Sequence, residues 1–256
     1  MNLPSLDLLF PRACVGCGGR PWPLCVQCRE GVAWLEPPGC RRCGRPLDIS
    51  PPTCRDCPPH AVAWSRAPFH YEGPVRRALM RLKFSGQRSV VEPFAAWMVE
   101  ALERAPPEFR LRSEEPGSMI TWVPLGRRRR RFRGFDQAEL LARAVGARTG
   151  LPVRRLLVRA VETAPQARRP GPERLATLRG AFNATALAPP GVVLVDDVLT
   201  SGATAAECAN VLLAGGAEEV GVLTAARALG GSLPPRCYNP PGLQPGSVVA
   251  RETSSR

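Results

Sequence analysis

Continuously apolar stretches alternate with amphipathic stretches over the last two thirds of the chain. The clearest apolar run, residues 192–195, ends in two carboxylates, Asp196 and Asp197. Such a run is typical of a parallel strand that is buried on both faces. Residues 205–214 then have a helical pattern, and residues 220–226 predict another strand. The right-handed crossover of this unit places the loop after Asp197 at the carboxyl edge of the sheet, where α/β proteins bind ligands.

Similar patterns predict further elements upstream. Residues 75–84 have helical spacing, with Val75, Leu79 and Leu82 on one face. Further helices are expected at residues 90–102 and from about Gln137, and strands at residues 67–71, 119–125 and 153–158. This alternation of strands and helices indicates an α/β fold.

Three segments lack a sustained period. Residues 105–117 are polar and proline-rich, which predicts a surface connection. Residues 159–179 are also polar and fit either a mobile lid over a site or a disordered link. Residues 230–256 are dominated by Pro, Gly, Ser and Arg, so we expect disorder there.

The loop after Asp197 carries groups that can hold a phosphorylated sugar. Its backbone N–H groups and the hydroxyls of Thr200, Ser201 and Thr204 can bind phosphate oxygens. The helix that follows turns its partly positive N-terminus toward the same place. Asp196 and Asp197 can accept hydrogen bonds from a ribose diol, as an acidic residue does in dinucleotide sites. The alternative is a buried strand that ends in an ordinary polar turn.

Six arginines lie between residues 126 and 133, directly before the helix that starts near Gln137. We interpret this segment as a flexible basic loop at a strand-to-helix junction. Guanidinium groups are planar forks that match phosphate oxygens, so such a loop is suited to pyrophosphate. Arg133 and Gly134 are the better candidates because they adjoin the helix start. Residues 127–131 taken alone also fit a solvated loop.

Eight of the ten cysteines form four Cys-x-x-Cys pairs within the first 57 residues. Each pair places two thiolates on one side of a tight knuckle, and two knuckles complete a tetrahedral zinc shell. Disulfides are the competing use, and a reducing cytosol disfavours them. An interleaved pairing of the knuckles is open, but sequence order predicts one zinc site from Cys14, Cys17, Cys25 and Cys28 and a second from Cys40, Cys43, Cys54 and Cys57.

Composition restricts the possible functions only slightly. The 256 residues carry a formal net charge of +13, almost all of it from arginine, and Lys83 is the only lysine. The charge favours an anionic partner without choosing between a nucleotide sugar and a polynucleotide. No apolar run approaches the length of a membrane span, and the first residues lack the features of a secretory signal. We therefore expect a cytoplasmic protein.

The order of motifs resembles the ComF family of competence-associated, phosphoribosyltransferase-like proteins. The resemblance covers residues 9–229 and rests on the four cysteine pairs and on these strings: L-K-F-S-G around Lys83, V-P-L followed by R-G-F-D-Q, T-A-P-Q, and V-V-L-V-D-D-V-L-T-S-G-A-T. It implies a double zinc ribbon at residues 9–60 and a phosphoribosyltransferase-like domain at residues 66–229, followed by the disordered tail. The implied domain is of type I, a parallel sheet with helices on both faces.

The resemblance also implies ligands and site residues. The ligands are phosphoribosyl pyrophosphate (PRPP) with Mg²⁺, and the implied role is in handling single-stranded DNA during natural transformation, together with other competence proteins. Asp196, Asp197 and Arg133 would be the catalytic residues. The residues implied to bind PRPP are Val198, Leu199, Thr200, Ser201, Gly202, Ala203, Thr204, Gly134 and Lys83.

Three functions remain open at this point. The first is a PRPP-binding protein that handles DNA, although the only aromatic candidates for base stacking that we identify are Trp22, Trp34 and Trp64. The second is an active transferase that moves ribose 5-phosphate from PRPP to a nitrogenous acceptor. The third is a zinc-held interaction adaptor.

The family usually has Asn where Asp136 stands, and a carboxylate there is a poorer neighbour for pyrophosphate.

Overall fold

The computed structural model describes residues 13–36, 38–55, 57–106, 117–160 and 180–229. The expected lid, apart from residues 159 and 160, and the expected tail lie outside these residues. Within the described residues, no helix is both long enough and apolar enough to cross a membrane.

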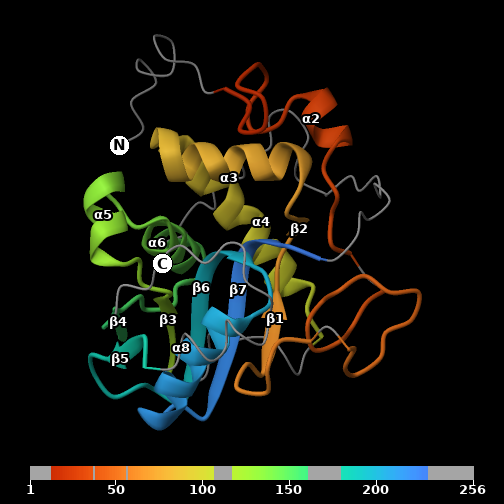
Figure 1. The fold of residues 1–256 in the computed structure, drawn as a ribbon. Coiled ribbons are helices and arrows are strands. Elements are labelled where there is room, and N and C mark those ends of the chain that lie inside the picture. The colour runs from red at the N-terminus through yellow and green to blue at the C-terminus, as the bar shows by residue number, and fades with distance from the viewer. Residues whose placement is uncertain (1–12, 37, 56, 107–116, 161–179, 230–256) are drawn as a thin grey trace, which may run out of the picture.

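The centre of the molecule is a parallel β-sheet (Figure 1). Its order is β1–β7–β6–β3, and β2 also pairs with β7. The register places Asp196 beside Thr224 and Leu199 beside Arg227, so the expected phosphate loop leaves β6 at the carboxyl edge. The strands are β1 (Trp64–Arg66), β2 (Phe69–His70), β3 (Ser118–Trp122), β6 (Gly191–Leu199) and β7 (Glu219–Arg227).

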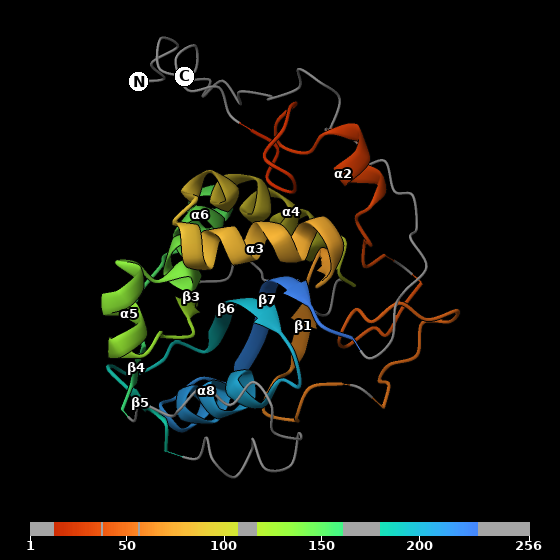
Figure 2. The ribbon, with the colours of Figure 1, turned by 45° about the horizontal axis from the view of Figure 1, so that its top comes forward.

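Helices cover both faces of the sheet, which confirms the α/β fold class (Figure 2). Alternate residues of β6 belong to two cores, with Val193 and Val195 facing one helical layer and Val192 and Leu194 the other. Burial on both faces explains why the strand reads as a continuous apolar run. The first layer holds α3 (Gly73–Ser85), η1 (Arg88–Val90), α4 (Val91–Glu103) and α6 (Gln137–Thr149), and the second holds α8 (Ala203–Ala214).

Two expected strands differ from the structure. The strand expected at residues 67–71 is present only as β2, two residues long, and β1 ends at Arg66 before the expected start, with Pro68 between the two strands. Proline has no backbone N–H for the ladder, so it divides the pairing. The strand expected at residues 153–158 is also wrong as a single element. Val153 forms an isolated bridge with Ile120, and β4 (Leu157–Arg159) pairs antiparallel with β5 (Phe182–Ala184) outside the main sheet.

The expected basic loop is a short helix, α5 (Arg127–Arg133). Arginine is a good helix former, and this preference outweighs the mutual repulsion of five exposed side chains, residues 127–131. Gly134 ends the helix in the left-handed conformation, with φ of 73°, and its N–H donates to the carbonyl of Arg130.

The cysteine-rich segment forms two lobes on different sides of the sheet domain. The first lobe contains α2 (Val26–Glu30) and packs on α3, where the Arg77 Nε donates to the carbonyl of Gly16 at 3.2 Å. The second lobe lies beside β1, where the backbone N–H of Ser65 donates to the carbonyl of Arg42 (Figure 1). The two lobes therefore have different neighbours, although their motifs look alike.

Candidate functional site

Asp197 lies at the centre of the charged groups that line the carboxyl edge. It follows Val195 on the face of β6 that α3 covers, and Lys83 of α3 forms an ion pair with its Oδ2. The two side chains are only 9% and 18% exposed. Burial disfavours the charge of Lys83, but the charge of Asp197 and their hydrogen bond outweigh it and raise the pKa of Lys83. Lys83 therefore keeps its charge at neutral pH.

Asp196 lies in a different environment from its neighbour. Its Oδ1 accepts the backbone N–H of Asp197 at 2.8 Å. Burial and the nearby charge of Asp197 raise its pKa. Asp196 is also close enough to the buried Cys208 of α8 for its charge, together with burial, to raise the pKa of that thiol. The alternation of side chains in a strand thus directs the two carboxylates to opposite faces of the sheet.

The loop between β6 and α8 leaves backbone donors uncommitted. In the described part of the chain, the N–H groups of residues 200, 201 and 202 donate to no protein acceptor. The Ser201 Oγ accepts the N–H of Ala203 at 3.4 Å, and Thr204 lies in the first turn of α8. These donors and the start of a 12-residue helix can accept an anion. The side chains of Val198 and Leu199 pack in the two cores, so only their backbone groups can meet a ligand.

Arg133 joins Lys83 near Asp197, whereas residues 127–131 are exposed. Burial lowers the pKa of Arg133, and the charge of Asp197 opposes this effect. The guanidinium also lies over the ring of Phe84, 5.0 Å from its centroid. The structure therefore brings Arg133, Lys83 and Asp197 together, and Arg133 is more buried than the other arginines of α5.

Asp136 caps a helix. Its Oδ1 accepts the N–H groups of Ala138 and Glu139, and its Oδ2 accepts the N–H of Leu125 at 2.8 Å. Burial raises the pKa of Asp136, and these three donors oppose that rise. The carboxylate that stands in place of the family's Asn is thus committed to the N-terminus of α6.

Two features of this edge escaped sequence reasoning. Phe132, within the arginine run, is 83% exposed, and Phe84 is 60% exposed. An aromatic residue inside a basic run was a signal in the sequence. In contrast, Trp34 and Trp64, considered for stacking, are core residues with 3% and 1% exposure. The second feature is the contact between the second cysteine lobe and the β6–α8 loop, for which the sequence carries no signal.

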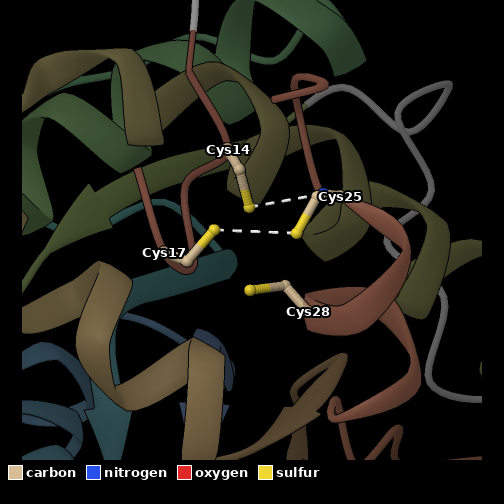
Figure 3. Close-up of side chains that lie close together, drawn as sticks. All are labelled: Cys14, Cys17, Cys25 and Cys28. Carbon is tan, nitrogen blue, oxygen red and sulfur yellow. Dashed lines mark hydrogen bonds between the residues drawn. The ribbon is translucent and has the colours of Figure 1, made fainter. Parts of the chain in front are cut away.

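The first cysteine cluster has the geometry of a tetrahedral metal site. Cys14 and Cys17 approach from the knuckle and Cys25 and Cys28 from α2, and the four side chains converge (Figure 3). All four sulfurs lie within 4.8 Å of one another, and those of Cys17 and Cys25 are 3.6 Å apart. Four sulfurs bound to one zinc at about 2.3 Å lie about 3.8 Å apart, so the cluster fits zinc.

The pKa values of the thiols in this cluster also indicate that a cation is needed. Burial opposes ionisation of Cys14, but the backbone N–H groups of Cys25 and Cys17 lower its pKa to about 6. Burial and the neighbouring thiols raise the pKa of Cys28 to about 12. Four thiolates at such close range cannot form together without a positive ion between them.

The second cluster has the same arrangement, so the pairing follows sequence order. The sulfurs of Cys40 and Cys57 are 3.6 Å apart, as are those of Cys43 and Cys54. Burial opposes ionisation of Cys43, but the charge of Arg227 lowers its pKa to about 7. Cysteines described by the structure form no disulfides.

The fold and the two clusters define an α/β protein with an N-terminal double zinc ribbon. The model of the double zinc ribbon domain matches residues 5–58, in agreement with two structural zinc sites. The chain is 28% identical to Competence protein F of Haemophilus influenzae over 230 residues, which are 86% of this chain and 98% of that protein. It is 26% identical to Competence protein ComFC of Bacillus subtilis over 204 residues, 74% of this chain and 78% of that protein.

A third relative reaches 30% identity. It is the DNA utilization protein YhgH of Escherichia coli O6:H1, matched over 215 residues, 81% of this chain and 92% of that protein. The chain therefore belongs to the ComF family, which includes these competence and DNA utilization proteins. Among solved structures there is no significant match.

Proposed function

We propose that this protein binds PRPP with Mg²⁺ at the carboxyl edge of the sheet and acts in the handling of DNA. The main support for PRPP binding is the position of the Lys83–Asp197 pair beside a loop whose backbone N–H groups have no protein acceptor among the described residues. A ligand with a phosphate at one end and a pyrophosphate at the other has partners at both ends of this site.

Each group has a role in this proposal. The N–H groups and hydroxyls of residues 200–204 hold the 5′-phosphate, and the helix N-terminus adds to their effect. Asp197 accepts hydrogen bonds from the ribose hydroxyls, and Asp196, on the other face, holds the backbone N–H of Asp197 through its Oδ1. Lys83 and Arg133 face the pyrophosphate, where their charges offset those of its oxygens. Magnesium, when bound, neutralises further negative charge of the diphosphate.

The test is calorimetric titration of PRPP and Mg²⁺ into the zinc-loaded protein. We expect Asp196→Asn with Asp197→Asn to abolish binding while the circular dichroism spectrum is retained. Glu103→Gln, at an exposed carboxylate at the end of α4, is the control and should bind as the unmodified protein does. Unchanged affinity in the double variant would remove the sugar-phosphate proposal.

The same cations favour a second candidate, an active transferase. Lys83 and Arg133 near Asp197 are suited to stabilise departing pyrophosphate as the bond at the ribose carbon breaks. A PRPP-dependent pyrophosphate-release assay against a panel of nitrogenous acceptors separates the two candidates. Release that increases with an added acceptor, above the rate of the protein without acceptor, establishes transfer, and release that no acceptor increases leaves a binding protein.

For the DNA half, we propose that single-stranded DNA contacts α5. The names of the relatives, competence protein and DNA utilization protein, favour DNA as the partner. On α5, residues 127–131 offer five exposed guanidinium groups for phosphates. Phe132 beside them is 83% exposed and offers a ring for base stacking. Proteins that bind single strands without sequence preference combine these two features.

The test is retention of a labelled single strand across a salt series. Each phosphate contact contributes a slope of about −0.7 in the logarithm of affinity against the logarithm of salt. Arg127→Gln with Arg131→Gln should therefore reduce the slope by about 1.4 if both contact phosphates.

Phe132→Ala should weaken retention by about 5-fold to 150-fold at every salt concentration, because stacking contributes about 1–3 kcal/mol per base. Leu187→Ala is the matched control, since Leu187 is 86% exposed but lies on another part of the chain. Equal retention by the Phe132 and Leu187 variants would contradict the stacking role.

A further inference from the structure

A basic pocket lies between the second cysteine lobe and the carboxyl edge of the sheet. Its volume is about 520 Å³. Arg45, Arg55 and Cys57 of the lobe line one side, and Thr200 and Ser201 of the β6–α8 loop line the other. Arg227, at the end of β7 and only 3% exposed, completes the wall. Hydroxyls of the expected phosphate loop thus share a cavity with three arginines.

The lobe is held firmly in this position. Arg227 donates from Nη1 to the carbonyl of Cys43 at 2.7 Å, which links β7 to a cysteine of the second cluster. On the other side of the loop, a Cβ added to Gly202 would lie 3.0 Å from Pro58 Cβ. The Nη2 of Arg42 donates to the carbonyl of Pro59 at 3.0 Å. The lobe and the loop therefore keep a fixed spacing, as a preformed site requires.

The charges of the pocket select an anion. No carboxylate is among its described lining residues, which carry three guanidinium groups and two hydroxyls. The second cysteine cluster itself needs positive charge nearby, because a zinc ion with four thiolates has a net charge of −2. Arg227 meets that need through Cys43. Arg55 is exposed and Arg45 is half-buried, so both can also meet a ligand from solvent.

We propose that the second zinc ribbon completes the phosphate site: Arg45 and Arg55 bind the 5′-phosphate of the sugar phosphate that the β6–α8 loop holds. This inference rests on the proposed function. It explains how a loop with no cation between residues 198 and 204 can hold a dianion while Lys83 is committed to Asp197. It also assigns different roles to the two ribbons, because the first lies on α3, away from the pocket.

The experiment compares two ligands, PRPP with Mg²⁺ and ribose 5-phosphate, by calorimetry on the zinc-loaded protein. Arg45→Gln with Arg55→Gln should weaken both by about 10-fold to 100-fold, since each charge-assisted bond to phosphate is lost. Zinc should stay at two ions per chain. Arg20→Gln with Arg29→Gln, in the first ribbon, is the control with the same change in net charge and should bind as before.

The outcomes separate this inference from the proposed function. If the unmodified protein binds neither ligand, the proposed function fails. If it binds both and the Arg45/Arg55 variant binds them equally well, only this inference fails. Loss of zinc from the variant would show that the arginines serve the metal cluster and would also overturn it. Arg55→Gln alone, at an exposed position, repeats the test with the least disturbance and should weaken both ligands by about 10-fold.

A change in retention of single-stranded DNA with unaltered affinity for both small ligands would overturn the inference as well. That result would assign the pocket to the polynucleotide backbone. A proportional loss for PRPP and ribose 5-phosphate, which share only the ribose and its 5′-phosphate, would support the assignment to that phosphate.

Discussion

Replacing Lys83 by methionine tests the buried ion pair at the centre of the site without any ligand. The change leaves the Asp197 carboxylate, 9% exposed, without its partner. Removing one member of a buried pair costs about 3–5 kcal/mol. We take about 3 kcal/mol, the lower end, because the Lys83 side chain is 18% exposed and Arg133 also acts on Asp197. At about 2–4 °C per kcal/mol, the melting temperature should fall by about 6–12 °C.

The assay is urea unfolding of the zinc-loaded protein, followed by tryptophan fluorescence at pH 7. Because the pKa of Lys83 is raised, the stability from its charge is fully present at pH 7 and is lost only as the pH rises through that raised value. Adding Asp197→Asn to Lys83→Met should restore about 2 kcal/mol, because no unpaired charge stays buried.

Arg148→Met is the matched control. It breaks the pair with Glu92, whose side chains are 40% and 59% exposed, and should cost less than about 1 kcal/mol. A cost for Lys83→Met no larger than that of this control, or a further loss when Asp197→Asn is added, would contradict a stabilising buried ion pair at this position.

Three further predictions concern the cap, the loop and the metal. Asp136→Ala should destabilise the fold by about 2 kcal/mol in thermal unfolding, because three backbone N–H groups lose their acceptor. Asp136→Asn should cost about 1 kcal/mol, because its amide oxygen still accepts from Ala138 and Glu139 but its NH2 group cannot accept from Leu125. Gly202→Ala should destabilise more than Gly150→Ala, since both have φ near 76° but only Gly202 would place its Cβ 3.0 Å from Pro58; equal losses would contradict the contact with the ribbon. Zinc affinity, measured with a competing indicator, should fall as the pH falls below 7, because thiols must lose protons to bind, and affinity that stays constant would exclude thiolate ligands.

The hydrophobic pattern predicted the sheet domain well where elements are long and buried. The strand at β6, the helix α8 and the strand β7 follow directly from an apolar run, a helical stretch and a second apolar run. The pairing of the cysteine knuckles in sequence order is confirmed by the two sulfur clusters. Each of these features is determined by residues that lie within about 20 positions of one another, so the local sequence pattern can predict it.

Short elements were harder to predict because single residues decide them. Pro68 lies near the start of an expected strand, which is shortened to β2, and Gly126 and Gly134 bound a helix where a loop was expected. The strand at β6 extends to Leu199, so Asp196 and Asp197 lie within it. Side-chain alternation then separates two carboxylates that look like one unit in the sequence.

The contact between the second ribbon and the phosphate loop could not be predicted, because it joins residues more than 140 positions apart. Arginine is common throughout this chain, so Arg45 and Arg55 do not stand out in the sequence. The residues around them do not predict a position near Thr200. The partners are selected by shape, since a side chain at Gly202 would press on Pro58, and by Arg227, which joins β7 to the carbonyl of Cys43. If the ribbon does supply the phosphate's cations, then loss of the second zinc should weaken PRPP binding more than loss of the first. Cys43→Ser and Cys17→Ser, one cysteine in each cluster, compare the two, and equal effects on affinity would mean that the ribbons only stabilise the fold.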